Sequence, residues 1–382
     1  MFRYFFTLVI SIYVPAVIYT GYRLWQMTKY FFPSAPRIGY WFFFLLFSLA
    51  FFLSRSVGSV LPDSISESIN LFSYYWLVAL LYLFVFLLGL DLIRFINKLT
   101  GISSGFDKLT PHILLGAVIL VGVILLYGTW NARHPRIMNY EITINKDAGS
   151  FKQLHVVMVS DLHLGAVVDR SRLEKMVNMI NALKPDLILM PGDIIEDEET
   201  FSEQNMLATF GKLQSKLGTF VSPGNHEYYR GTTKKSFDRL KEVGISVLED
   251  DYVKIADSFY IVGREDPAVE RSQGKKRKDL GEILDDVDKK LPIILLNHQP
   301  TELETAEKEG VDLQLSGHTH RGQVFPANLI TSRIFEQDWG YLKKGGLQLI
   351  VSCGYGTWGP PFRIGNKPEI VNIVINFHGG QA

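Results

Sequence analysis

Four long apolar stretches dominate the first third of the chain. They cover residues 4–22, 38–53, 71–93 and 113–129. A membrane-spanning helix needs about 20 apolar residues, so three of the stretches are long enough, while the second is short but rich in Phe. Aromatic residues such as Trp25, Trp41 and Trp130 lie at the ends of the stretches, as is typical of helices that meet the bilayer interface. We therefore predict a transmembrane domain of about four helices in residues 1–130.

A signal peptide or buried core helices would account less well for the apolar stretches. A cleaved signal peptide would account only for the first stretch, and no small-residue cleavage site follows it. Helices buried in a soluble core seldom lack charged residues over such lengths. Ionisable residues are nearly absent from the stretches except near their ends, as at Asp91, so the helices predict an anchor and not a transport path.

Basic residues between the stretches predict how the chain crosses the membrane. The first connector is flanked by Arg23, Lys29 and Arg37, the third by Arg94, Lys98 and Lys108, and the second only by Arg55. Because positive residues favour the cytoplasmic side, four spans would place the rest of the chain outside the cytoplasm. We expect a multi-pass protein of the cell membrane with an extracytoplasmic C-terminal domain.

A change of composition after Trp130 marks this second domain. Residues 131–140 predict a polar linker, and residues 141–382 have the mixed composition of a soluble domain. The Val-rich run 154–159 predicts a buried strand, residues 172–183 an amphipathic helix and residues 187–190 another strand, which together predict a βαβ unit. Further strands are predicted at residues 219–222, 293–296, 313–316, 347–352 and 370–377, and a helix at residues 234–243. The second domain is therefore expected to be α/β.

Charge and cysteine content narrow the choice of function. The 382 residues include 39 Lys and Arg against 39 Asp and Glu, so no excess of positive charge points to a nucleic-acid partner. Cys353 is the only cysteine, which excludes a disulfide framework within the chain and a thiolate zinc cluster.

Polar residues with metal-binding side chains follow five of the predicted strands. They are Asp161 with His163, Asp193, Asn225 with His226, His298, and His318 with His320. Ligands bind at the carboxyl ends of the strands in α/β sheets, so we expect these side chains to meet at one rim. Their donor atoms are oxygen and nitrogen without sulfur, a set that suits Mn, Fe or Zn. An Asp between two such cations can bridge them, and the pair then activates a shared water for phosphoryl displacement.

The same residues resemble the motifs of the calcineurin-like metallophosphoesterase superfamily. The motifs are Asp161-Leu162-His163, Gly192-Asp193, Gly224-Asn225-His226-Glu227, Asn297-His298 and Gly317-His318-Thr319-His320. Each motif alone is weak, but all five occur in the family's order and each follows a predicted strand. The resemblance covers roughly residues 155–377 and implies a two-sheet αββα sandwich after the helical membrane domain.

The resemblance also implies a role for each residue. Asp161, His163 and His320 would bind a first divalent ion, Asn225, His298 and His318 a second, and Asp193 would bridge the two. His226 would bind no metal and would instead stabilise the transition state or protonate the leaving oxygen. Glu196 stands where relatives often carry Asp, and we expect it to support a metal ligand.

Two further segments look typical of a membrane-anchored bacterial branch of the family. They are residues 263–267 and 354–363. In the second segment, Trp358 could wall a substrate pocket and Arg363 could bind a phosphate, as could Arg321 after the last motif. Alternatively, residues 354–363 form a rigid turn that packs against the rim. Arg321 could likewise be a surface Arg without a role.

The expected activity is that of a metal-dependent phosphoester hydrolase with a hydroxide activated by two metal ions. The membrane helices favour a lipid-linked phosphodiester or pyrophosphate held at the bilayer as the substrate. The alternatives are a broad phosphodiesterase or phosphatase on soluble substrates, and a membrane signalling protein with a regulatory phosphoesterase domain. A receptor with a vestigial enzyme domain fits less well, because degenerate domains lose ligands and every expected ligand is present.

Overall fold

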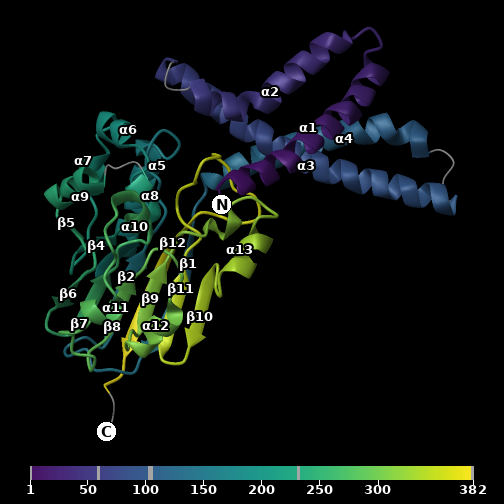
Figure 1. The fold of residues 1–382 in the computed structure, drawn as a ribbon. Coiled ribbons are helices and arrows are strands. Elements are labelled where there is room, and N and C mark those ends of the chain that lie inside the picture. Colours follow the sequence, from purple (N-terminus) through teal and green to yellow (C-terminus); the bar gives the residue numbers. More distant parts are fainter. Residues whose placement is uncertain (1, 58–60, 102–105, 230–232, 380–382) are drawn as a thin grey trace. The chain divides into compact units, whose positions relative to one another are not determined.

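The computed structural model describes residues 2–57, 61–101, 106–229 and 233–379. The chain forms two compact units, Met1–Gly128 and Thr129–Ala382 (Figure 1). Each unit has hydrophobic cores of its own, so each is described by itself.

Four long helices make up the N-terminal unit. They are α1 (Phe2–Phe31), α2 (Arg37–Val57), α3 (Asp63–Thr100) and α4 (Phe106–Ala132), whose last turn belongs to the second unit. Within the described residues, α2, α3 and α4 are long and apolar enough to cross a membrane. The short, Phe-rich stretch therefore lies in a helix of sufficient length. The expected span over residues 4–22 lies in α1, but the side chains of residues 2–9 are outside the described part.

One ionic cluster joins α1 to α3 in this unit. Arg23 is buried, and its Nη2 lies 2.8 Å from Oδ1 of Asp91, while the hydroxyl of Tyr19 donates to Oδ2 of Asp91 at 2.6 Å. An ionisable group within a bilayer is costly unless it is paired. These bonds explain how a charged residue of α1 and one of α3 can lie among apolar helices.

Two six-stranded sheets form the centre of the C-terminal unit. Their strand orders are β1-β12-β2-β3-β4-β5 and β10-β11-β9-β8-β7-β6. The first sheet contains β1 (Arg136–Ile144), β2 (Gln153–Met158), β3 (Leu187–Pro191), β4 (Thr219–Ser222), β5 (Ile245–Val247) and β12 (Glu369–Phe377). The second contains β6 (Asp251–Ile255), β7 (Phe259–Gly263), β8 (Ile293–Leu296), β9 (Leu313–Ser316), β10 (Gly340–Lys344) and β11 (Leu347–Val351).

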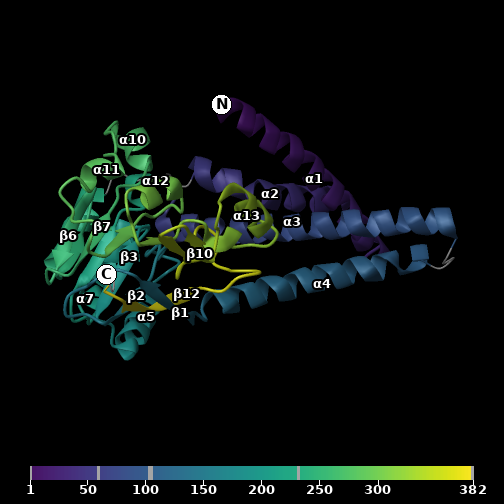
Figure 2. The same cartoon turned by 90° about the horizontal axis from the view of Figure 1, so that it is seen from below.

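Helices cover the outer face of each sheet. Those on the first sheet are α5 (Arg170–Leu183), α6 (Glu198–Glu203), α7 (Met206–Phe210) and α9 (Thr233–Glu242), and those on the second are α11 (Leu280–Ile283) and α12 (Leu303–Lys308). Figure 2 shows the two sheets between these helical layers. The two-sheet αββα sandwich that the resemblance implied is therefore confirmed.

The alternation of side chains between the two faces of the central strands explains the layers of sheets and helices. In β2, Leu154, Val156 and Met158 belong to the core between the sheets, whereas Val157 belongs to the core beneath the outer helices. Successive side chains of a strand point to opposite faces. A strand that is buried on both faces therefore needs a continuous apolar run, which is the pattern that predicted this strand.

The segment between α4 and β1 is shorter than the linker predicted over residues 131–140. Helix α4 continues to Ala132, and β1 begins at Arg136 and pairs in parallel with β12. The first six residues of β1 alternate between partly buried and exposed positions at the edge of the sheet. Their polar composition therefore hid an edge strand from the sequence analysis, and this boundary is corrected.

Candidate metal centre

The polar motifs lie at the carboxyl ends of strands from both sheets. Asp161 and His163 follow β2, Asp193 follows β3, Asn225 and His226 begin α8 (Asn225–Tyr229) after β4, His298 follows β8, and His318 and His320 follow β9. Strand β3 of the first sheet contacts β8 of the second, so the loops from the two sheets adjoin. The structure thus brings together residues that are far apart in the sequence.

Five of these residues have left-handed backbone conformations. They are Asp161, His163, Asp193, His318 and His320, with φ between 45° and 70°. Positive φ is uncommon in residues other than glycine, and backbone strain of this kind clusters at functional sites. The strained positions therefore mark the same loops as the polar motifs.

Asp161, His163 and His320 form one group of possible metal ligands. Nε2 of His163 lies 3.0 Å from Nε2 of His320, which lies 3.5 Å from Oδ1 of Asp161. Nδ1 of His163 lies 3.0 Å from Oε2 of Glu196. A proton on Nδ1 donated to this carboxylate leaves the lone pair of His163 on Nε2, where it can bind a metal.

Asp193, His298 and His318 form a second such group, and Asn225 lies within it. Nε2 of His298 is 3.1 Å from both Oδ2 of Asp193 and Oδ1 of Asn225, and Nδ1 of His318 is 2.8 Å from the same Asn225 oxygen. Nδ1 of His298 donates to the carbonyl of Pro191 at 2.9 Å. This bond again leaves Nε2 of the imidazole directed at the centre of the group.

The two groups adjoin one another. Nε2 of His163 in the first group lies 3.7 Å from Oδ2 of Asp193 in the second. All converging atoms are carboxylate or amide oxygens and imidazole nitrogens, a donor set that fits Mn, Fe or Zn. A cation among them would relieve the contact between the lone pairs of His163 and His320, so the residues present fit divalent metal ions.

Two of the histidines are held neutral, which is the form that binds metal. Burial holds the pKa of His320 well below its ordinary value, and the nearby guanidinium of Arg363 adds to the effect. Burial likewise lowers the pKa of His318.

His226 lies beside the metal groups and differs from them in its protonation. Its Nδ1 lies 2.6 Å from Oε2 of Glu196. Burial disfavours the charged ring, but the hydrogen bond to Glu196 and the charge of Asp193 outweigh burial and raise the pKa of His226. Burial opposes ionisation of Glu196 too, yet the bonds from His163 and His226 lower the pKa of Glu196 to about 2. The contact therefore favours the protonated form of His226 and the ionised form of Glu196.

Glu227 ties the loops after β3 and β4 together, a role that the sequence analysis did not assign. Its carboxylate accepts backbone N–H bonds from Asp193, Ile194, Ile195 and Gly224 at distances of 2.6 to 3.3 Å. Gly224 permits this close approach, because a Cβ there would lie 2.2 Å from Oδ1 of Asp193. The only signal in the sequence was the place of Glu227 in its motif, since these four partners are backbone groups.

The predicted phosphate contact of Arg363 is corrected. The Arg363 side chain is fully buried, with 0% of its surface exposed. Its Nη2 donates to Nδ1 of His320 at 3.2 Å and to the carbonyl of Gly356 at 2.7 Å, and Nη1 donates to Asn366 at 3.1 Å. The turn packs tightly, since a Cβ on Gly356 would lie 2.0 Å from the carbonyl oxygen of Leu162. Arg363 therefore lies beneath His320 and has no surface to offer a substrate.

Trp358 and Arg321 remain accessible. Trp358 is 57% exposed, and its ring centroid lies 6.1 Å from that of His226. Tyr229 is also exposed, with its ring 5.5 Å from His226. The guanidinium of Arg321 stacks over the ring of Trp339 at 4.1 Å. Two exposed aromatic rings thus border His226.

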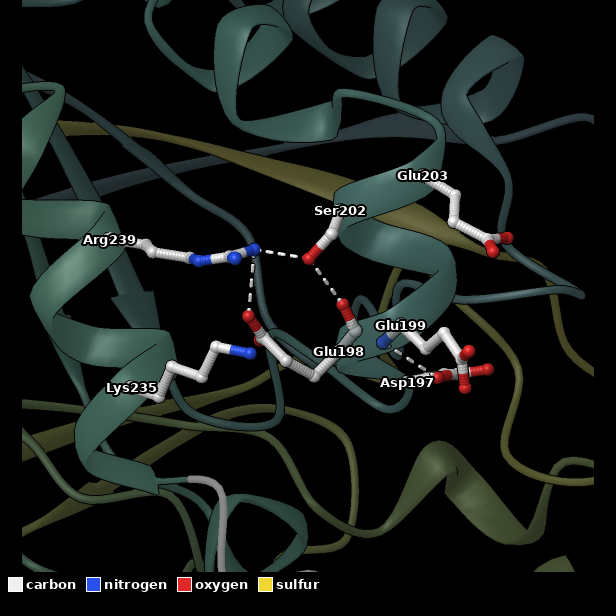
Figure 3. Close-up of a pocket in the computed structure, with 7 residues that line it drawn as sticks. All are labelled: Asp197, Glu198, Glu199, Ser202, Glu203, Lys235 and Arg239. Carbon is white, nitrogen blue, oxygen red and sulfur yellow. Dashed lines mark hydrogen bonds and ion pairs between the residues drawn. The ribbon is translucent and has the colours of Figure 1, made fainter.

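A surface cavity of about 720 Å³ lies between α6 and α9 (Figure 3). It is lined by charged side chains, including Lys235, and Arg239 pairs with Glu198 there at 2.9 Å. Its lining contains none of the motif histidines. The cavity is therefore separate from the two metal groups.

Known proteins resemble this chain along most of its length. The calcineurin-like phosphoesterase family matches residues 154–322. A transmembrane protein with metallophosphoesterase domain from Danio rerio is 30% identical over 363 residues, which cover 90% of this chain and 82% of that protein. An uncharacterized metallophosphoesterase from Aquifex aeolicus is 36% identical over 229 residues, covering 59% of this chain and 87% of that protein. Another, from Helicobacter pylori, is 28% identical over 375 residues, covering 96% and 98%. The chain therefore belongs to the calcineurin-like phosphoesterases and is a membrane-associated, metal-dependent phosphoester hydrolase.

Proposed function

We propose that the two residue groups hold two divalent ions. Asp161, His163 and His320 bind the first, Asn225, His298 and His318 the second, and Asp193 bridges them. The position of Asp193 supports the bridge, because its Oδ2 lies 3.7 Å from Nε2 of His163 and 3.1 Å from Nε2 of His298. When bound, such a pair of ions acidifies a water and polarises the phosphoryl oxygens.

His226 supplies the proton for the leaving oxygen. Its Nδ1 is engaged by Glu196, so the N–H of Nε2 remains free to donate. Its backbone N–H also donates to Oδ1 of Asp193 at 2.9 Å, which fixes the ring next to the bridging carboxylate. A positioned imidazole of this kind typically contributes a rate factor of about 10²–10⁴.

The substrate is a lipid-linked phosphodiester or pyrophosphate held at the bilayer. The observation that carries this proposal is the exposed indole of Trp358 beside His226 in a protein with apolar helices long enough to span a membrane. An indole at that position can hold an acyl or prenyl chain while the phosphate reaches the metal groups. Arg321 offers a guanidinium for a second phosphate.

The competing proposal is a soluble phosphoester, with the helices serving only to set the location. The test compares kcat/KM for a lipid-linked diphosphate with that for its water-soluble headgroup analogue, in detergent. We expect the wild type to prefer the lipid form and Trp358→Ala to lose that preference. Tyr341→Ala, which removes a partly exposed aromatic ring on β10, is the matched control. Equal use of both substrates, with no effect of Trp358→Ala, would refute the lipid-linked proposal.

The N-terminal helices form a multi-pass domain, and the catalytic unit lies outside the cytoplasm. The support is the greater number of Lys and Arg residues around the first and third connectors than around the second, since such residues favour the cytoplasmic side. Protease added to intact cells should then cleave the catalytic unit. Protection in intact cells, with cleavage only after permeabilisation, would assign the unit to the cytoplasm.

A further inference from the structure

An exposed apolar surface follows the last histidine motif. It consists of Phe325, Leu329, Ile330 and Ile334, and we call it the α13 patch after α13 (Asn328–Ile334). Ile330 and Ile334 are 60% and 67% exposed, and no residue of α13 is buried. Contiguous apolar surface of this kind on a globular unit marks a site of protein or membrane contact.

Helical spacing gathers the apolar residues of α13 on one side. At about 100° per residue, Leu329, Ile330 and Ile334 share one half of the helix with Arg333, and Ser332 lies on the opposite half. Apolar side chains with a basic residue among them are the composition of a helix that lies in a membrane interface. The long stem of Arg333 lets its charge reach the headgroups from such a position.

The α13 patch is bonded to the segment that receives the last turn of α4. The backbone N–H of Phe325 donates to the carbonyl of Ile364 at 2.8 Å. The carbonyls of Arg363 and Asn366, on either side of Ile364, accept from Nδ2 of Asn131 at 3.0 and 2.6 Å. Asn131 is buried and lies in the last turn of α4. Residues 363–366 therefore contact both the end of α4 and the start of the patch.

Helix α4 relates segment 363–366 to the bilayer. Its membrane-compatible stretch runs from Lys108 to Ala132, so a bilayer crossed by this stretch would end close to the turn that contains Asn131. Arg172 also holds this turn, donating to the carbonyl of Ala132 at 2.9 Å. Segment 363–366 and the patch bonded to it are therefore tied to the end of the helix that would cross the bilayer.

We propose that the α13 patch inserts into the interfacial layer of the bilayer that α4 crosses. It forms a second attachment of the catalytic unit to the bilayer, in addition to α4. The anchored segment also supports the metal groups, because Nδ2 of Asn366 donates to the carbonyl of His320 at 2.9 Å. The patch therefore holds the metal groups at the level of the lipid headgroups. This inference is independent of which phosphoester is cleaved.

Fluorescence quenching tests the position of the patch in the full-length protein. Cys353 is fully buried, so a cysteine introduced at the surface can be labelled selectively with an environment-sensitive dye. Ile330→Cys and Ile334→Cys report on the patch, and Ser332→Cys on the opposite side of α13 is the control. Each labelled protein is reconstituted in vesicles of phosphatidylcholine and phosphatidylglycerol. Dyes at positions 330 and 334 should be quenched by doxyl-labelled lipid and be severalfold less sensitive to iodide than the dye at position 332.

Two results would overturn the proposal. Dyes at 330 and 334 that respond to iodide like the dye at 332, and not to doxyl lipid, would mean that the patch faces water. Dyes shielded from both quenchers would mean that protein covers the patch, either a second copy of the chain or another segment of the same copy. Hydrolysis of a soluble phosphodiester at the wild-type rate by each variant verifies that the labelled proteins are folded.

Discussion

Oε2 of Glu196 lies 2.6 Å from Nδ1 of His226 and thereby joins this ring to the first metal group. The same oxygen lies 3.0 Å from Nδ1 of His163. One carboxylate therefore orients a proposed metal ligand and a proposed general acid together. Such outer contacts fix the tautomer and the direction of a ring, so changes at Glu196 should alter both metal binding and proton transfer.

The Glu196→Gln variant should change the pH dependence of turnover. The bond and charge of Glu196 raise the pKa of His226, and His226 acts in its protonated form, so activity falls as pH rises through that pKa. Removing the charge lowers the pKa, and the alkaline limb of the kcat profile should move to lower pH. Glu199→Gln, an exposed glutamate in the first turn of α6, is the control. A reduced kcat with an unmoved alkaline limb would separate Glu196 from proton transfer.

The His226→Ala variant should lose rate mainly on substrates with poor leaving groups. General acids contribute about 10²–10⁴-fold to such steps, whereas an aryl leaving group needs little protonation. Metal content should stay at the wild-type level, because the proposal makes His226 a proton donor and not a metal ligand. The measurement is kcat for an alkyl and an aryl phosphodiester, with elemental analysis of both proteins. Loss of metal from the variant would instead make His226 a ligand.

The sandwich and the grouping of its polar loops could be predicted because both depend on local signals. An apolar run such as residues 293–296 ends in a polar residue, here Asn297 before His298, and strand ends in an α/β sheet converge. Edge strand β1 lacks such a run, so the polar composition of residues 136–140 predicts a linker where the structure has a strand. The backbone N–H groups that bond to Glu227 cannot be recognised from residue types in the sequence.

The burial of Arg363 could not be predicted either, for a different reason. Arginine is seldom fully buried, so an Arg in a motif next to a proposed metal site suggests an anion contact. Here close contacts that only glycine permits fold the turn inward: Gly354 and Gly356 lie against Asp161 and Leu162, and the carbonyls of both glycines accept from Arg363. Only the tertiary packing of the turn decides which way the guanidinium points.

Substitution of the bridging residue should affect both proposed ions, and substitution of Asn225 mainly one. Asp193→Asn should lower the content of both metals, because the amide cannot bridge with two anionic oxygens. Asn225→Ala should mainly weaken the group that contains His298 and His318. Elemental analysis of the purified variants gives the metal content per chain. Full metal and full turnover in Asp193→Asn would contradict the assignment of the bridge.

The Glu227→Gln variant should be less stable and less active. The carboxylate accepts four backbone N–H bonds, and an amide NH₂ at the same place would face donors and leave them unsatisfied. Each buried donor without a partner costs about 1–3 kcal/mol. The free energy of unfolding in urea, measured in detergent, should fall, and turnover should fall with it. Glu203→Gln, an exposed glutamate at the end of α6, should leave both unchanged, and equal behaviour of the two variants would contradict the role of Glu227.

Comparison of Arg363→Lys with Arg321→Lys should distinguish positioning from substrate binding. A lysine at position 363 cannot donate at once to His320, Gly356 and Asn366, and hydrogen bonds to a charged group contribute about 1.5–3 kcal/mol each. Arg363→Lys should therefore lower metal affinity and kcat while KM stays near the wild-type value. Arg321 has its guanidinium at the rim, so Arg321→Lys should raise KM and leave metal content unchanged. If Arg363→Lys raised KM and kept its metals, the guanidinium would have to reach the substrate, and the buried conformation would not be the one that turns over.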